Sequence, residues 1–179
     1  MKLALSTLFL LVFSIAPTWA QKENDWRWRV QAGIGIPSSS DGGGFLGSRP
    51  LSLGGSYDIG RVAKGKWGVF YDGVVRENRY VAVSTIGLGA QIRLPAGNSF
   101  YYGGGIGRFR AGHTRLGSVS DSSESYLTGQ RVFVGSERGR YFAELGYLFL
   151  ERILVTHSGE SGGFLVEPGS FSARLGIRF

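Results

Sequence analysis

The chain has 179 residues, a length that favours a single domain. It contains 30 glycines and 12 phenylalanines but no cysteine, so disulfides and thiolate chemistry are excluded and short strands are favoured over long helices. Its formal net charge is +7, which favours anionic partners.

Residues 1–20 have the three parts of a secretory signal peptide. A short basic start with Lys2 precedes an apolar core at 3–15, and Ala20 ends the segment on a small residue. We therefore predict cleavage after Ala20 and one domain at 21–179. Removing Lys2 leaves nineteen Lys and Arg against thirteen Asp and Glu, a net charge of +6. In an exported chain this charge favours anionic lipid headgroups or lipopolysaccharide phosphates over nucleic acid.

Eight segments of the exported part alternate between two faces, which is the pattern of β-strands because successive side chains leave a strand on opposite sides. In the first segment, Trp28, Val30 and Ile34 share one face, and Arg29 and Gln31 share the other. Its eleven residues are about what a tilted strand needs to cross the hydrocarbon of a bilayer. The predicted strands are 26–36, 51–59, 67–75, 82–94, 100–111, 126–135, 141–149 and 171–179.

The connections between these strands alternate in length. Long polar loops are predicted at 37–50, 111–125 and 151–170, and short turns at 61–66, 95–98 and 136–140. The connection at 77–80 is the exception, because it is short but falls on the side of the long loops. Small outer-membrane barrels carry long extracellular loops and short periplasmic turns. We therefore expect both termini in the periplasm.

The pattern predicts an all-β fold, an eight-stranded antiparallel up-and-down transmembrane β-barrel. No apolar run after the signal peptide is long enough for a spanning helix, and a closed sheet is the other structure that satisfies every backbone group in lipid. A soluble barrel of the lipocalin type would be polar outside and apolar inside. Here Gly and Arg share one face while Trp, Tyr and Ile share the other, which favours an apolar face toward lipid.

The fifth predicted strand carries three glycines in alternation, Gly103, Gly105 and Gly107. No helix follows them, so a phosphate-binding loop is not indicated. We interpret them as inward-facing positions that leave room for Arg side chains from neighbouring strands. The opposite face ends in Arg108 and Arg110, which are costly at the middle of a bilayer, so a β-bulge is an alternative there.

Three motifs carry a resemblance to a known family: Tyr-Tyr-Gly-Gly-Gly-Ile-Gly at 101–107, Phe-Ala-Glu-Leu-Gly-Tyr at 142–147 and Ala-Arg-Leu-Gly-Ile-Arg-Phe at 173–179. With them, nearly the whole exported chain resembles the small outer-membrane barrels of the OmpA, OmpX and opacity-protein kind. The resemblance implies a monomer in the outer membrane. It also implies that Phe179 is the signal read by the barrel-assembly machinery. The expected role is structural or adhesin-like, with the loops binding an extracellular surface ligand.

The inward face of the predicted barrel is rich in charge. An eight-stranded barrel has an interior just wide enough for side chains, so ion pairs are expected to fill it, with a narrow channel as the alternative. The excess of Arg leaves anion binding open, and Glu137 is a further candidate member. The predicted lumen network consists of Arg27, Arg29, Asp58, Asp72, Arg76, Arg93, Arg131, Glu144, Arg174 and Arg178.

The alternative function is a lipid A-modifying enzyme of the deacylase kind. It would need a Ser activated by a His that a carboxylate orients. Candidate sets are His113 with Ser118 and Glu124, and His157 with Ser158 and Glu160.

That deacylase family places Ser two residues after His, where this chain has Arg115 and Gly159. Neither set matches, so the chain is predicted not to be an enzyme. The two His lie in different loops at no recognised ligand spacing, so no metal or cofactor is expected.

Overall fold

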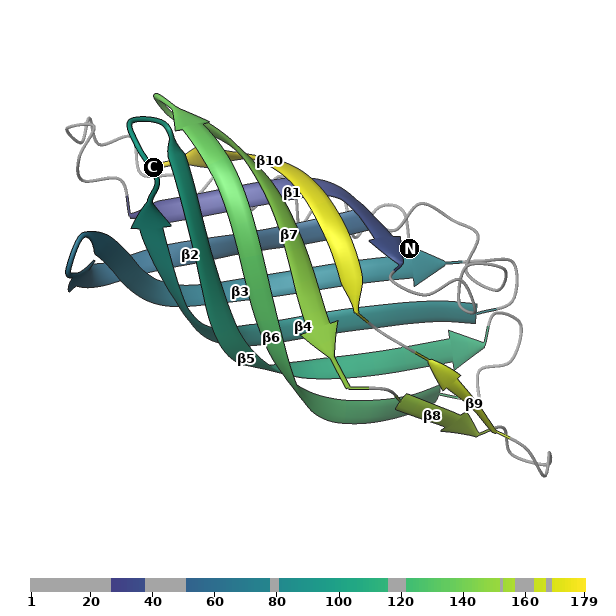
Figure 1. Cartoon of the computed structure of the whole chain (residues 1–179). Coiled ribbons are helices and arrows are strands. Elements are labelled where there is room, and N and C mark those ends of the chain that lie inside the picture. The colour runs from purple at the N-terminus through teal and green to yellow at the C-terminus, as the bar shows by residue number, and fades with distance from the viewer. Residues whose placement is uncertain are drawn as a thin grey trace.

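The strands form a closed antiparallel barrel in the computed structural model (Figure 1). The structure describes residues 27–37, 51–77, 81–115, 122–151, 153–156, 163–166 and 169–179. Around the barrel the strand order is β1-β10-β7-β6-β5-β4-β3-β2. The strands are β1 (Trp28–Pro37), β2 (Leu51–Val62), β3 (Gly65–Glu77), β4 (Val81–Pro95), β5 (Phe100–Arg115), β6 (Ser122–Arg138), β7 (Tyr141–Leu150), β8 (Ile153–Thr156), β9 (Gly163–Val166) and β10 (Ser170–Arg178).

Pairing of the first and last strands closes the barrel. β1 pairs with β10 from Arg29↔Arg178 to Pro37↔Ser170. Beyond this ladder, Trp28 and Phe179 exchange backbone hydrogen bonds of 3.1 and 2.9 Å. The predicted eight-stranded antiparallel barrel is therefore confirmed. Among the described residues, no helix has the length and apolar character needed to span a membrane.

The two ends of the barrel differ. We call the end that carries the β2–β3, β4–β5 and β6–β7 turns the turn end, and the opposite one the loop end. β4, β5 and β6 have 15, 16 and 17 residues, whereas β1, β7 and β10 have 10, 10 and 9. The wall of the barrel is therefore longest over β4, β5 and β6.

Part of the predicted loop at 111–125 belongs to this long wall. β5 and β6 pair from Ala111↔Ser125 to Thr114↔Ser122, and residues 116–121 lie outside the described part of the chain. The two strands are held together there by backbone hydrogen bonds, and neither has an apolar face. The sequence of this segment therefore lacks the alternation of apolar and polar residues by which strands were predicted. The prediction of a loop across 111–125 was wrong for that reason.

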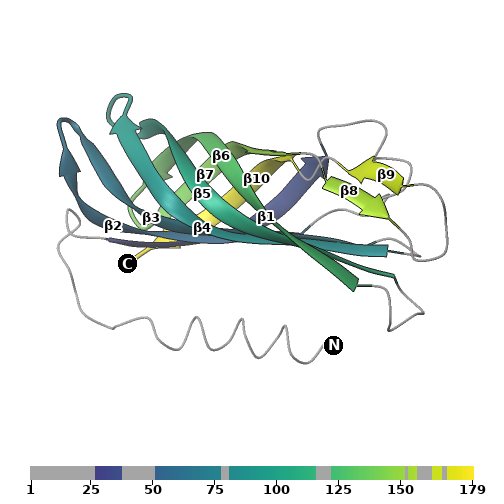
Figure 2. The same cartoon turned by 90° about the horizontal axis from the view of Figure 1, so that it is seen from below.

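The predicted loop at 151–170 also contains regular structure. β8 and β9 pair with each other from Ile153↔Val166 to Thr156↔Gly163 and form a separate two-stranded sheet. Figures 1 and 2 show this hairpin at the loop end, beside the barrel strands. Each strand has only four residues, too few for alternation to be recognised.

The two faces of the wall separate by polarity as the alternation predicted. Leu88, Leu145 and Leu175 are 69%, 62% and 73% exposed on the outside. On the inside, Phe70 and Phe109 are almost completely buried. Large hydrophobic side chains are thus exposed around the barrel, a distribution opposite to that of a soluble protein.

Two aromatic clusters fill the described interior. Tyr101, Phe133 and Phe142 form the cluster at the turn end. Phe70 and Phe109 pack with Leu148 nearer the loop end. These large side chains occupy the space inside the strands, as expected for a barrel too narrow to hold a wide pore.

Inward-facing glycines make room for these rings. A Cβ added to Gly87 would lie 2.1 Å from Cδ1 of Phe109, and one added to Gly103 would lie 2.4 Å from Cζ of Phe133. A Cβ added to Gly105 would lie 2.8 Å from Cε1 of Phe70, whereas one added to Gly107 would meet backbone atoms of Leu88 and Gly89 on β4. The predicted role of Gly103, Gly105 and Gly107 as space for Arg is therefore corrected, because their nearest neighbours are aromatic rings and the β4 backbone. Arg174 approaches a different glycine, Gly54, with Nη1 3.0 Å from its ideal Cβ.

Candidate functional site: a charge network in the lumen

Arg174 on β10 organises the centre of the lumen. Its Nη1 and Nη2 donate to the two carboxylate oxygens of Asp72 on β3, at 2.8 and 2.6 Å, and its Nε donates to Ser52 Oγ on β2 at 2.7 Å. All three residues are buried. This two-point geometry is the strong form of an Arg–carboxylate pair, and it ties three strands together across the interior.

Arg131 on β6 joins this pair to a second carboxylate. Its guanidinium binds Glu144 directly, and its Nη1 lies 3.8 Å from Asp72 Oδ2. The same guanidinium lies over the rings of Phe133 and Phe70, with its Cζ 4.7 and 5.3 Å from their centroids. The cation is therefore held by two carboxylates and two aromatic faces.

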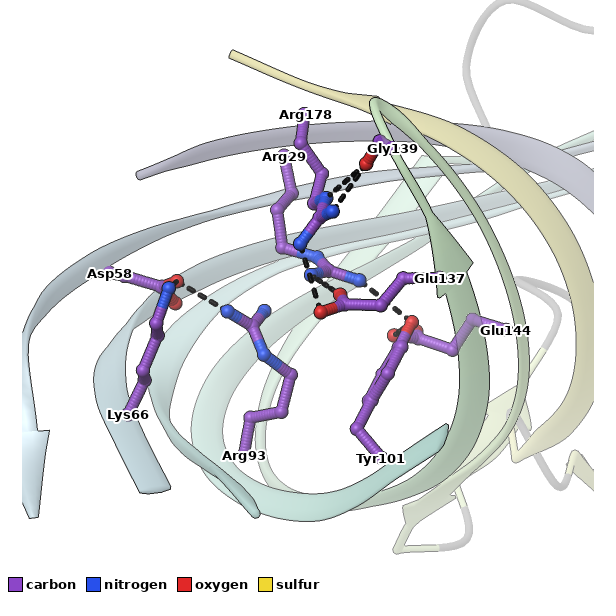
Figure 3. A network of polar contacts seen from close by, with 9 residues as sticks. All are labelled: Arg29, Asp58, Lys66, Arg93, Tyr101, Glu137, Gly139, Glu144 and Arg178. Carbon is purple, nitrogen blue, oxygen red and sulfur yellow. Dashed lines mark hydrogen bonds and ion pairs between the residues drawn. The ribbon is translucent and has the colours of Figure 1, made fainter. Parts of the chain in front are cut away.

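Tyr101 connects the central cluster to the turn end. Its hydroxyl accepts a 2.8 Å hydrogen bond from Arg29 Nη2 and donates a 3.3 Å bond to Glu144 Oε2. Figure 3 shows this hydroxyl between the Arg29 and Glu144 side chains. Because one hydroxyl group serves as acceptor and donor, the two charge clusters form one continuous network.

Glu137 is the anion of the turn-end cluster. Its two carboxylate oxygens bind Arg29 Nη1 at 2.8 Å and Arg178 Nη1 at 2.9 Å (Figure 3). Nε of Arg178 also donates to the carbonyl of Gly139 at 3.1 Å. Arg29 lies over the Phe142 ring, 3.9 Å from its centroid. β1, β6 and β10 are thus fastened together where the barrel closes.

A third cluster lies across the lumen from Glu137. Arg93 binds Asp58 through a direct ion pair, and Lys66 Nζ lies 3.8 Å from Asp58 Oδ2. The Arg93 guanidinium lies 5.7 Å from the centroid of the Tyr101 ring, so Tyr101 borders this cluster as well (Figure 3). Within the described residues, the network contains six cationic side chains and four carboxylates.

The structure places eight of the ten predicted lumen residues in this network: Arg29, Asp58, Asp72, Arg93, Arg131, Glu144, Arg174 and Arg178. Arg27 is different, because it precedes β1 and its side chain is exposed. Its placement in the lumen is corrected: the inward face of the strand ends before it. Arg76 lies in β3 by its backbone, and its side chain is outside the described part.

Sequence reasoning missed Tyr101, Lys66 and Ser52 as members of the network. Tyr101 shares a face with Gly103 and Gly105, so the alternation of β5 contained the signal for its inward position. Lys66 was assigned to a turn, but β3 begins at Gly65.

The residues of the enzyme hypothesis are only partly described. Glu124 lies on β6, where its exposed carboxylate binds Arg110 at Nε with a 2.9 Å hydrogen bond. His113 lies on β5 by its backbone. The side chain of His113 and all of Ser118, His157, Ser158 and Glu160 fall outside the described residues. Within the described part, no three His, Cys, Asp or Glu side chains gather as metal ligands would.

The charge network is better suited to holding the strands in one arrangement than to catalysing a reaction. Each lumenal cation in the described network has a carboxylate within ion-pair distance. Removing one member of a buried pair leaves an uncompensated charge, so these contacts strongly favour one arrangement of the strands. The network crosses the interior and occupies it together with the aromatic clusters.

Comparison with known proteins identifies the fold. No protein-family model matches the chain, and no curated protein sequence is significantly similar to it. Among solved structures, Neisserial surface protein A is similar with a TM-score of 0.55 at 16% identity, over 86% of this chain and 97% of that one. The Yersinia pestis outer membrane protein Ail gives 0.53 at 11%, over 87% and 100%. The outer membrane enzyme PagL gives 0.51 at 16%, over 84% and 99%.

These similarities confirm the resemblance to small eight-stranded barrels at the level of the fold. The three proteins include a surface protein and an enzyme, so the shared barrel does not specify an activity.

Proposed function

We propose that the chain is a monomeric outer-membrane barrel that interacts with an extracellular surface ligand through its loop end. The observation that carries the membrane assignment is the polarity of the wall: large hydrophobic side chains are exposed outside, and paired charges lie inside. In water, such an outer surface would associate or aggregate. In a bilayer, it is the surface that lipid requires.

In this proposal the signal peptide is cleaved after Ala20 and both termini lie in the periplasm. Phe179, whose backbone pairs with Trp28, is the residue recognised by the barrel-assembly machinery. Outer-membrane lipid and lipopolysaccharide surround the wall.

The lumen has a structural role in this proposal and does not conduct. Two aromatic clusters and the charge network occupy successive levels of the interior. A channel would need a continuous polar path, whereas these side chains bind one another across it. Recordings in planar bilayers should therefore show no conductance steps, and regular steps would contradict a plugged lumen.

The loop end supports a surface-interaction role because it presents ordered structure beyond the barrel. β5 and β6 have 16 and 17 residues, while about 9–11 suffice to cross a bilayer. The β8–β9 hairpin adds a second ordered projection there. Rigid elements that present loops to solvent are a common form of binding surface.

Cell attachment is the experiment that tests this role. The hairpin segment 153–166 is replaced by a short Gly-Ser linker, and insertion is checked by detergent extraction from outer-membrane fractions. Attachment to a host or neighbouring cell surface should fall while the amount of inserted barrel stays the same. Unchanged attachment for this variant and for variants shortened at 38–50 and 116–121 would contradict the surface role.

Two further results would contradict parts of the proposal. An exported chain that stays folded and monodisperse in buffer without detergent would remove the membrane assignment. Lipid A from cells with and without the chain should have the same acyl pattern in mass spectra. A changed pattern would replace surface interaction with lipid A modification.

A further inference from the structure

Exposed basic side chains gather on one side of the turn end. One lies near the end of β2, one lies in the β2–β3 turn, one precedes β1, and one ends β6. They come from sequence positions more than 100 residues apart, so the sequence does not show them as a group. We call these four residues the basic arc: Arg27, Arg61, Lys64 and Arg138.

Barrel closure makes the arc continuous. The order of neighbours along this side is β3-β2-β1-β10-β7-β6, so the ends of β2 and β6 that carry arc residues lie on either side of β1 and β10. Figure 1 shows the β2–β3 and β6–β7 turns at the same end of the barrel as the C-terminus. The remaining turn, between β4 and β5, spans 96–99 and contains no charged residue. The basic character is therefore confined to one sector of the rim.

The acidic side chains that the structure describes near the turn end are bound inside the lumen. Asp58 is buried against Arg93, and Glu137 is bound by Arg29 and Arg178 in the lumen. Among the described residues of the turn end, no Asp or Glu side chain is exposed.

Aromatic side chains lie directly beside the arc on the outer face of the wall. Trp28, Trp67 and Tyr141 are exposed at the turn ends of β1, β3 and β7. Exposed Trp and Tyr concentrate at the level of lipid headgroups. Arg27 directly precedes Trp28 in sequence, and Lys64 precedes Trp67 by three residues. Arg138 precedes Tyr141 by three residues, so the cations lie at the same end of the barrel as these aromatic side chains.

We propose that the basic arc binds the phosphate groups of anionic phospholipids in the leaflet at the turn end. This inference rests on the membrane location proposed above. Both charge and place favour this partner: Lys and Arg near a bilayer surface attract anionic lipids, and interfacial aromatics hold the side chains at that depth. Arg in particular binds phosphate with two parallel hydrogen bonds. The arc would thereby gather anionic phospholipid on one side of the barrel.

Tryptophan fluorescence provides a local readout. The three tryptophans after the predicted cleavage site are Trp26, Trp28 and Trp67, all at or next to the turn end in sequence. The exported chain is reconstituted in phosphatidylcholine vesicles that contain brominated phosphatidylglycerol, brominated phosphatidylcholine or a brominated phosphorylated glycolipid. Bromine quenches nearby Trp, so the extent of quenching gives the relative affinity of each lipid for this end.

Brominated phosphatidylglycerol should quench more strongly than brominated phosphatidylcholine. In the double variant Arg61→Gln/Lys64→Gln, the preference for phosphatidylglycerol over phosphatidylcholine should fall about fivefold for each cation removed. This factor corresponds to the contribution of one basic residue near an anionic surface. Arg27→Gln/Arg138→Gln tests the other part of the arc with the same expectation. The matched control is Arg108→Gln/Arg110→Gln, which removes two exposed cations of β5 far from the arc and should keep the preference.

Equal quenching by the two phospholipids, or an unchanged preference in both arc variants, would overturn the inference. Stronger quenching by the glycolipid than by phosphatidylglycerol would also overturn it, because the occupant would then be a glycolipid. Failure of the proposed membrane location has a different result: neither brominated lipid would quench the tryptophans at all.

Discussion

Arg174 is the residue on which the central ion pairs depend most. Asp72 is 2% exposed in the structure, and replacing Arg174 by Ala leaves Arg131 Nη1, 3.8 Å away, as its remaining cation in the described network. Breaking a buried pair by removing one partner costs about 3–5 kcal/mol. We expect Arg174→Ala to lower the free energy of unfolding by about that much, measured by urea denaturation in lipid vesicles.

The controls for this prediction separate an orphaned charge from lost volume. The double variant Asp72→Leu/Arg174→Met should recover a large part of the stability, because no charge is left buried without its partner. Glu124→Gln weakens the exposed Arg110 pair and should change stability little. If Arg174→Ala unfolds like the wild type, the lumen network does not hold the barrel together.

Gly87 tests the corrected role of the inward glycines. A Cβ at this position would lie within 2.1–2.5 Å of three ring carbons of Phe109, and no backbone atom is among its nearest neighbours. Overpacking of a filled core costs about 1–3 kcal/mol. Gly87→Ala should therefore lower the unfolding midpoint in urea.

Relief of the clash identifies the cause. Adding Phe109→Leu to Gly87→Ala should raise the unfolding midpoint part of the way back to the wild-type value, because the smaller side chain leaves space for the added Cβ. Gly73→Ala is the matched control, because its added Cβ would meet nothing closer than 3.7 Å. Equal losses in Gly73→Ala and Gly87→Ala would indicate a general backbone effect in place of ring packing.

At the residue scale, the sequence predicts which face a side chain occupies but not its partner. Alternation placed Arg29 and Arg178 inside, and the structure finds both there. Their shared partner Glu137 comes from a strand on the other side of β7, and the link through Tyr101 spans 72 residues of sequence. Such pairs depend on how far the strands are staggered around the barrel, a quantity that no single strand encodes.

At the scale of elements, prediction succeeded where one face is apolar and failed where it is not. The segment 141–149 alternates cleanly and is β7, observed as Tyr141–Leu150. The extension of β5 to Arg115 has a polar sequence and was predicted as loop. Alternation of apolar and polar residues arises where one face of a strand is buried or contacts lipid. It therefore gives no signal for a strand segment that projects into water.

The β8–β9 hairpin is expected to be independent of barrel stability. Within the part of the chain that the structure describes, it forms its own sheet and pairs with no barrel strand. Replacing 153–166 by a flexible linker should therefore leave the urea unfolding midpoint of the barrel within experimental error of the wild type. A lower midpoint, measured in the same vesicles, would show that the hairpin packs on the barrel and would weaken its use as a separable binding element.

At the scale of the whole molecule, the barrel combines a lumen held by ion pairs with an apolar exterior. Alternation alone separated the two faces, but it could not identify which one lies inside. Burial of Asp72 and Phe109 against exposure of Leu145 and Leu175 settles that assignment. The contact that closes the molecule, β1 with β10, joins residues about as far apart as the chain allows, so it follows from the number and twist of the strands.

Depth-dependent substitution on the outer face tests the membrane assignment for the whole molecule. Leu145 is 62% exposed near the middle of β7, and Tyr141 is 69% exposed at the turn end of the same strand. A lipid-facing Arg costs about 2–4 kcal/mol at the bilayer midplane and about 0–1 kcal/mol near an interface. Leu145→Arg should therefore destabilise the barrel in vesicles far more than Tyr141→Arg, measured by urea unfolding. In a water-soluble barrel both positions would face solvent and both substitutions would be nearly neutral, so equal and small effects would mean that the exposed apolar wall does not contact lipid.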